Sequence, residues 1–203
     1  EAAGGMHGAN RLGGNSLAEC LVFGRIVGAE AARASAELDV QVRDRVAIDE
    51  AREEVDAMLA RRGDEFARPL QRALRDLMSE HCGVVRSDGG LREGLRALGD
   101  IRERTRALEV RPDIAGYADL AHAFDLHGSL LAARATLQCA LERRETRGAH
   151  NRTDFPAQDP ALRVNLVWTT DGPIAHEPIA APSVRVGALA GGDEIELAGR
   201  LLE

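Results

Sequence analysis

One pattern dominates the sequence between residues 46 and 148. Leu, Val, Ile and Met recur there at intervals of three and four residues, and charged side chains occupy most of the positions between them. This is the period of an amphipathic α-helix, and turns containing glycine or proline interrupt it. The pattern predicts helices over residues 47–62, 65–84, 90–110 and 117–146. We therefore expect a mainly α fold built on a three-helix bundle of antiparallel helices.

A further helix is predicted ahead of this region, over residues 17–37. Ser16 and Glu19 have the spacing of a capping box, in which each side chain accepts a hydrogen bond from the other residue's backbone amide. The helix is apolar on almost every side, and such a helix is normally buried. Deprived of its neighbours, it would expose an apolar surface that favours self-association.

The helical period stops after Gly148. Five prolines follow, at positions 156, 160, 173, 178 and 182, and proline interrupts a helix. Residues 161–180 alternate between apolar and polar side chains, and Asp171 and Gly172 form a turn dipeptide within them, which predicts a β-hairpin. We therefore expect a partly extended tail.

Composition excludes several kinds of partner and site. The net charge is −7 without any lysine, so neither nucleic acid nor an anionic lipid surface is expected as a partner. The three cysteines, at positions 20, 82 and 139, lack metal or disulfide spacing, and the six histidines show no metal-ligand pattern. We therefore expect no metal site. We also expect neither a signal peptide nor a membrane-spanning helix, and a reducing cytosol as the compartment of the protein. The start at Glu1 suggests a piece of a longer protein.

The loop "HGANRLGGNSL" at residues 7–17 is the clearest candidate binding site. Gly8, Gly13 and Gly14 let the backbone adopt left-handed conformations and turn its amides toward a ligand. The free amides at the start of the following helix favour an anion or an electron-rich ring. Arg11 is the one permanent charge of the loop, and a guanidinium binds a carboxylate through two parallel hydrogen bonds.

Two motifs resemble one known family. "GGMHGANRLGGNSLAECLVFGRIVG" closely resembles the segment that closes the flavin site in the flavoprotein subunits of succinate dehydrogenase and fumarate reductase, and L-aspartate oxidase is a relative. "RRETRGAHNRTDFP", residues 143–156, is similar to the signature that follows the helical domain of the same family. Both motifs stand in the family's order, with a helical stretch of suitable length between them.

The resemblance implies FAD as cofactor and a dicarboxylate, succinate or fumarate, as substrate. Arg11 then matches the arginine that holds a substrate carboxylate, and Glu1 matches the acidic residue that contacts the ribityl or ribose part of FAD. Asn15, Ser16 and Leu17 match the turn against the isoalloxazine ring. His7 belongs to the same motif, and we expect it to pack behind the contact residues rather than to take part in catalysis. We expect Arg147, His150, Arg152 and Asp154 to dock against the flavin domain or a partner subunit.

The resemblance also implies a division of the chain. Residues 1–45 are expected to be the C-terminal end of an FAD-binding domain, residues 46–148 a helical bundle similar to a spectrin repeat, and residues 149–203 the extended tail. The family's GxGxxG strand, its proton-transferring arginine and its flavin-linking histidine are not in this sequence. We therefore expect the fragment alone to lack both FAD and activity.

The implied partners and the alternatives complete this interpretation. In this family electrons leave through an iron–sulfur subunit, and anchor subunits give an indirect association with the membrane, so a cytoplasmic position at its inner face is expected.

Two alternatives remain open. The chain could belong to an L-aspartate oxidase, although that enzyme usually has Gly-Leu-His where this chain has Gly148, Ala149 and His150. It could also be a non-catalytic helical interaction or assembly module.

Overall fold

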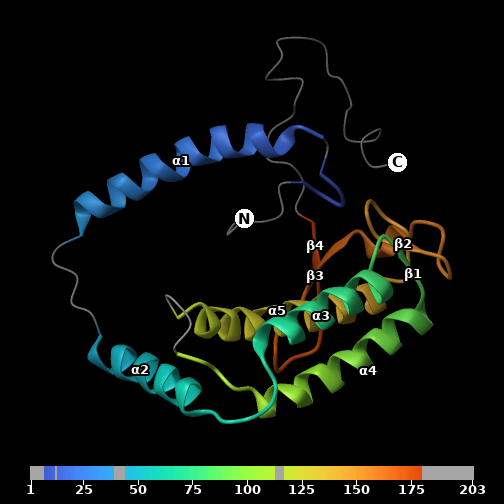
Figure 1. Ribbon diagram of the computed structural model, residues 1–203. Helices are drawn as coiled ribbons and strands as arrows, with labels where there is room; N and C mark the ends of the chain where they lie inside the picture. Colours follow the sequence, from blue (N-terminus) through green and yellow to red (C-terminus); the bar gives the residue numbers. More distant parts are fainter. Residues whose placement is uncertain (1–6, 12, 39–43, 113–116, 180–203) are drawn as a thin grey trace. The chain divides into compact units, whose positions relative to one another are not determined.

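A computed structural model of the chain describes residues 7–11, 13–38, 44–112 and 117–179 (Figure 1). The chain forms two compact units, Glu1–Asp159 and Pro160–Glu203. The helices of the first unit are α1 (Asn15–Glu37), α2 (Arg45–Ala60), α3 (Ala67–His81), α4 (Asp88–Arg104), the short η1 (Thr105–Ala107) and α5 (Ala118–Glu142). Its strands are β1 (Val85–Arg86) and β2 (Asn151–Arg152), and the second unit contains η3 (Pro160–Leu162), β3 (Val164–Val167) and β4 (Ala175–Pro178). The mainly helical fold predicted from the sequence is confirmed.

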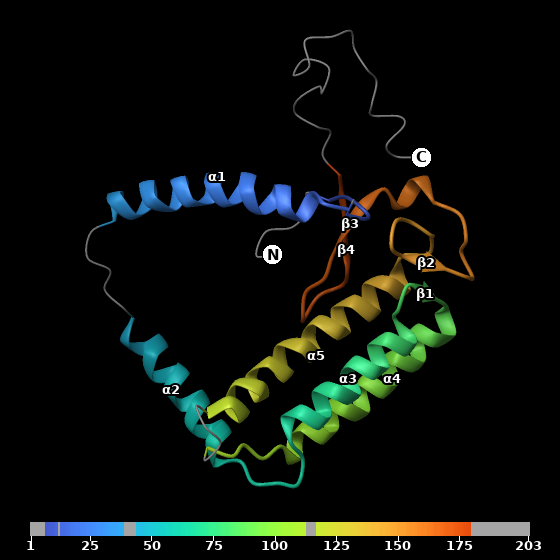
Figure 2. The same cartoon turned by 45° about the horizontal axis from the view of Figure 1, so that its top comes forward.

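The bundle consists of α3, α4 and α5, which lie along one another in Figure 2 and contact each other in all three pairings. Each helix contributes apolar side chains at the spacing of one helix face, and together they form the core. The members from α3 are Ala67, Leu70, Leu74 and Leu77; those from α4 are Leu91, Leu98 and Ile101; those from α5 are Ala123, Leu126, Ala133, Leu137 and Ala140. The three-helix bundle therefore follows directly from the periodicity.

Gly94 lies where side chains of α3 and α5 both come close to the backbone of α4. A Cβ atom placed on Gly94 of α4 would lie 2.9 Å from Cβ of His81 in α3 and 3.0 Å from Cδ2 of Leu137 in α5. Such distances are below ordinary van der Waals contact, so the bundle needs glycine at this position.

The helix α2 lies outside the bundle core. The side chain of Asp44 caps its first turn by accepting a hydrogen bond from the Val46 amide at 2.9 Å. None of its residues is buried, but Met58 and Leu59 near its C-terminal end pack against the core. Its charged surface agrees with the amphipathic pattern of residues 47–62.

The first helix begins differently from its prediction. α1 starts at Asn15, two residues before the predicted start, and no side chain caps it. The predicted capping box is wrong because Glu19 binds His7 instead. Leu17, Leu21 and the other apolar side chains of α1 are not buried, as those of such a helix normally are, but exposed in the described part of the chain, as expected when the helix is deprived of its neighbours. A helix this apolar needs a covering surface that the described residues do not supply.

The second unit contains the predicted hairpin. β3 and β4 pair in antiparallel register, from Val164 opposite Pro178 to Val167 opposite Ala175. Asp171 and Gly172 lie in the connection between the strands, as the sequence predicted. Among the described residues, no helix combines the length and apolar character needed to cross a membrane.

Candidate functional site

The candidate site begins with the glycine loop that leads into α1. Gly8 and Gly14 adopt left-handed backbone conformations, with φ of 56° and 83°, which glycine adopts without steric cost. A Cβ atom on Gly13 or Gly14 would meet no described atom within 4 Å. The backbone of the loop is therefore open on the side where a ligand could approach.

Polar groups at the start of α1 are available on this open side. Arg11 is exposed and has no hydrogen-bond or ion-pair partner among the described residues. Asn15 is exposed, Ser16 is half-buried, and 73% of Leu17 is exposed. No side chain caps α1, and the Leu17 amide of its first turn donates to the Gly14 carbonyl at 3.1 Å. The N-terminal end of a helix favours a hydrogen-bond acceptor. The structure thus brings Arg11, Asn15, Ser16 and Leu17 to one loop and helix start; Glu1 lies outside the described residues.

His7 ties the loop to the helix. Its Nε2 lies 2.5 Å from Oε2 of Glu19, one turn into α1. This hydrogen bond from His7 holds the pKa of the Glu19 carboxyl below its usual value. The side chain therefore links residue 7, at the start of the loop, to α1.

The second motif forms a tight turn. The Arg147 amide donates to the His150 carbonyl at 2.8 Å and the His150 amide donates to the Arg147 carbonyl at 3.0 Å. Gly148 has a φ of 57°, and the φ of Ala149 is not positive. Glycine in the first central position is typical of a type II′ turn. We call residues 147–150 the RGAH turn.

The RGAH turn contacts the glycine loop. The Ala149 amide lies 3.4 Å from the Ala9 carbonyl oxygen, and a Cβ atom on Gly148 would lie 2.2 Å from the same oxygen. Only a residue without a side chain fits there unless the backbones move. The two motifs, more than a hundred residues apart in the sequence, are therefore in direct contact.

Buried charges hold the base of the turn. Glu145 is fully buried and accepts hydrogen bonds from Nη1 of Arg143 at 2.6 Å and from Nε and Nη2 of Arg147 at 2.9 and 3.1 Å. The Asp159 amide also donates to Glu145 at 2.9 Å. Burial raises the pKa of Glu145, but these hydrogen bonds, led by the one from Arg147, outweigh burial and lower it overall. The carboxylate therefore stays charged and fixes Arg147.

His150 holds the other side of the turn. Its Nε2 lies 2.9 Å from the Arg143 carbonyl oxygen, which can only accept, so Nε2 carries the proton and Nδ1 accepts from Nη1 of Arg86 at 2.9 Å. Burial lowers the pKa of His150, the Arg143 carbonyl opposes that shift, and the nearby charge of Arg86 adds to it. The neutral ring thus links the turn to β1.

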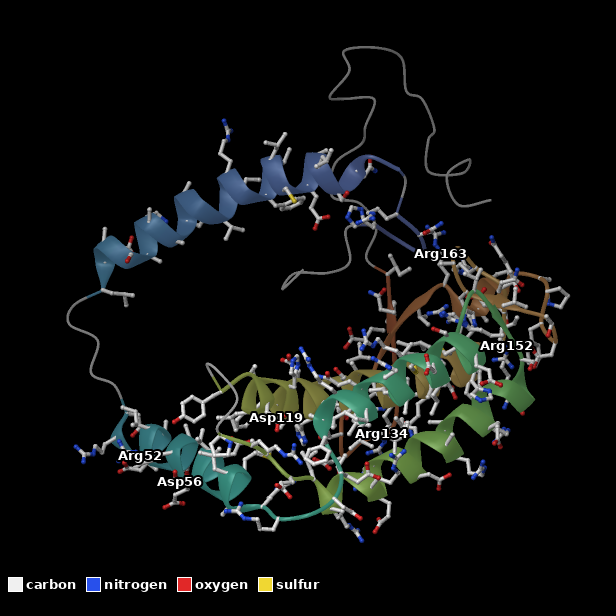
Figure 3. The ribbon with its side chains drawn as sticks, viewed as in Figure 1. Arg52, Asp56, Asp119, Arg134, Arg152 and Arg163 are labelled. Atoms are coloured by element: carbon white, nitrogen blue, oxygen red, sulfur yellow. The ribbon has the colours of Figure 1, made fainter. Side chains whose placement is uncertain are left out.

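Arg152 joins the ends of two bundle helices. It is fully buried, and Nη1 donates to the Ala140 carbonyl at 2.8 Å, near the C-terminal end of α5 (Figure 3). Nε and Nη2 donate to the two oxygens of Asp154 at 2.8 and 2.7 Å. Asp154 in turn accepts from the Asp88 amide, the first of α4, at 3.0 Å. A cation thus lies at a helix C-terminus and an anion at a helix N-terminus, as the helix dipoles favour.

These contacts revise the role expected for the motif. Arg147, His150, Arg152 and Asp154 use their polar groups within the chain, and the contact with the leading segment is made by the backbone of Gly148 and Ala149. Sequence reasoning missed this network because Arg86 and Asp88 lie far before the motif in the sequence, and Glu145, which lies within the motif, was not singled out. The one available signal was the alternation of opposite charges just after a helix.

The loop fits a flavin in the chemistry of its donors. An electron-rich ring edge or a pyrophosphate accepts hydrogen bonds, and the uncapped amides of α1 and the exposed guanidinium of Arg11 are donors. Fold and site together define a helical domain whose RGAH turn contacts a glycine loop with exposed hydrogen-bond donors.

Comparisons with known proteins identify the family. The family profile described as "Fumarate reductase flavoprotein C-term" matches residues 71–186, more than half of the chain. An uncharacterized FAD-dependent oxidoreductase of Methanocaldococcus jannaschii is 36% identical over 82% of this chain and 30% of its own length. The succinate dehydrogenase flavoprotein subunit of Coxiella burnetii is 32% identical over 86% of this chain and 30% of its own length.

A solved structure shows the same likeness in three dimensions. The structure of Mycobacterium smegmatis Sdh1 in complex with UQ1 superimposes with a TM-score of 0.81 at 29% identity, covering 100% of this chain and 35% of that one. The chain therefore belongs to the C-terminal domain of the succinate dehydrogenase and fumarate reductase flavoproteins, a family of oxidoreductase subunits. It spans about a third of the length of the relatives it matches.

Proposed function

We propose that the whole protein is the flavoprotein subunit of a succinate dehydrogenase or fumarate reductase. It interconverts succinate and fumarate by hydride transfer to or from FAD. The observation that carries this proposal is the contact of the Arg11 loop, through Ala9, with the RGAH turn of the family's helical domain. Residues 1–45 are then the end of the FAD-binding domain, residues 46–148 the helical domain and residues 149–203 the tail.

Each site residue has a proposed task. Arg11 binds one carboxylate of the dicarboxylate, because its guanidinium is exposed and unpaired among the described residues. The first turn of α1, with Asn15, Ser16 and Leu17, lies against the flavin ring, since its amides are uncapped. Glu1 contacts the ribityl or ribose part of the cofactor, and His7 fixes the loop through Glu19. FAD, when bound, supplies the hydride acceptor or donor.

The residues of this chain are not sufficient for the reaction. The dinucleotide fingerprint and the proton-transferring arginine expected in this family are not in the sequence. We therefore propose that these 203 residues alone neither retain FAD nor oxidise succinate.

The proposed partners follow from the electron balance. Oxidation of succinate releases two electrons, and the three cysteines of this chain lack the spacing of an iron–sulfur cluster. An iron–sulfur subunit is the proposed acceptor, and anchor subunits hold the complex at the inner face of the membrane while this subunit remains cytoplasmic.

The test uses the full-length protein. The proposal expects a yellow preparation whose visible flavin absorbance bleaches on addition of succinate and recovers with fumarate. L-aspartate added in place of succinate should leave the spectrum unchanged. A colourless full-length protein would overturn the proposal, and bleaching by L-aspartate but not by succinate would assign the chain to L-aspartate oxidase instead.

A further inference from the structure

We propose that Gly148 is a positioning residue for Arg11, and that the RGAH turn sets the substrate affinity of the site from the helical domain. This inference rests on the proposed function, because it takes Arg11 as the group that binds the dicarboxylate. It adds a site of control outside the flavin-binding domain, at a residue that does not touch substrate or cofactor.

The geometry of the contact supports the first step. The Ala9 carbonyl oxygen faces Gly148, where a Cβ atom would lie 2.2 Å away, and the Ala149 amide points to the same oxygen at 3.4 Å. Ala9 stands only two residues before Arg11. A side chain at position 148 would therefore displace the backbone that carries the guanidinium.

The turn is rigid enough to impose its position on the loop. Two reciprocal backbone hydrogen bonds close it, Arg147 is held by the fully buried Glu145, and His150 is held between the Arg143 carbonyl and Arg86. The glycine loop, by contrast, has open space around Gly13 and Gly14. When the two segments are forced apart, the loop is the part that moves.

The chemistry of Arg11 makes the displacement measurable. Two parallel hydrogen bonds from a guanidinium to a carboxylate require a fixed orientation, and they weaken steeply when donor and acceptor are misaligned. A small error of placement in an active site can reduce activity by about a hundredfold.

The test is a double-mutant cycle on the full-length FAD-loaded protein. Gly148→Ala and Gly148→Asn are each combined with Arg11→Lys, which keeps the charge but loses the planar fork. The dissociation constant of malonate, a dicarboxylate without an oxidisable carbon pair, is read from the flavin spectrum, together with KM and kcat for succinate. Asparagine tolerates the positive φ of this turn but still carries a Cβ, so it separates turn strain from contact with Ala9.

The proposal expects both substitutions at position 148 to weaken malonate binding and raise KM by about tenfold in the Arg11 protein, at normal flavin content and with little change in kcat. In the Arg11→Lys background, the same substitutions should change binding by less than about twofold. An equal effect in both backgrounds, or an effect of Gly148→Ala that Gly148→Asn lacks, would overturn it. Loss of flavin in both position-148 variants would also overturn it, since the residue would then serve folding. If Arg11→Lys leaves malonate binding unchanged, the proposed function of Arg11 fails instead.

Discussion

Two buried charged side chains lie just after the C-terminal end of α5. Arg152 and Glu145 are fully buried, yet every buried polar side-chain atom among the described residues has a hydrogen-bond partner. A buried charge that loses its partners costs far more than an exposed one. Arg152 replaces a helix cap on α5 and, through Asp154, also binds the first amide of α4.

Replacing Arg152 with methionine should therefore destabilise the protein strongly. Arg152→Met keeps most of the volume but removes the Arg152 donors from the Ala140 carbonyl and from Asp154, which keeps only the Asp88 amide of the donors described above. We therefore expect a loss of about 3 kcal/mol in the free energy of unfolding. The matched control is Arg92→Met, whose ion pair with Asp88 is exposed and should contribute less than about 1 kcal/mol. Urea unfolding measures both; equal effects would show that burial of Arg152 is unimportant.

His150 makes stability depend on pH. Its folded-state pKa lies below the unfolded value, mainly because of burial. As the pH falls below about 6.5, the unfolded chain binds a proton that the folded ring does not. The stability contributed by the neutral ring is thus present above that pH and is lost as the pH falls toward the folded-state pKa.

The matching variant is His150→Gln, whose amide can still donate to the Arg143 carbonyl. We expect its unfolding free energy to fall less steeply than that of the original chain when the pH is lowered from about 7 to about 5. Parallel pH profiles of the two proteins in urea unfolding would contradict the assignment of a neutral, buried ring.

At the scale of elements, α4 offers two glycines in opposite environments. A Cβ on Gly94 would lie closer than van der Waals distance to His81 and Leu137, whereas a Cβ on Gly99 would meet nothing within 4 Å. Both lie within the same helix, so their intrinsic cost to helix formation is alike.

Alanine at the two positions should therefore have opposite effects. Gly99→Ala should raise the free energy of unfolding by up to about 1 kcal/mol, because alanine favours the helix. Gly94→Ala should lower it by about 1–3 kcal/mol, because the added methyl group overpacks the core. Thermal unfolding of the two variants measures both changes in stability. Stabilisation by Gly94→Ala would show that the three helices are packed less closely than described.

For the whole molecule, the sequence predicted the local elements, helices and hairpin, better than the contacts between distant segments. The helices at residues 47–62, 65–84, 90–110 and 117–146 and the hairpin at 161–180 were recognisable from period, because each has its own repeating face. The helix at 17–37 was recognisable from its continuous apolar run. The helix ends were less certain: 90–110 joins α4 and η1, and Ser16 does not cap α1. Three features link distant segments: the pairing of β1 with β2, the Arg152 network, and the contact between Ala9 and Gly148. The spacing of residues along the sequence does not reveal such long-range contacts.

The candidate site was predicted as a set of residues but not as an arrangement. Arg11 was proposed from the loop, and Asn15, Ser16 and Leu17 from the family resemblance, yet the sequence could not show that the RGAH turn lies against Ala9. Family membership explains why both motifs occur in one chain, and the structure shows that they are in contact.

The most direct test of the central claim is the succinate-dependent reduction of a dye by the full-length protein with Arg11 replaced by alanine. The matched control is Arg68→Ala, an exposed arginine of α3. Loss of two charge-assisted hydrogen bonds, each contributing about 1.5–3 kcal/mol, should lower kcat/KM by at least about a hundredfold while flavin content stays unchanged. The control should keep its full activity. If Arg11→Ala also retains activity, Arg11 does not bind the dicarboxylate and the assignment of this loop is contradicted.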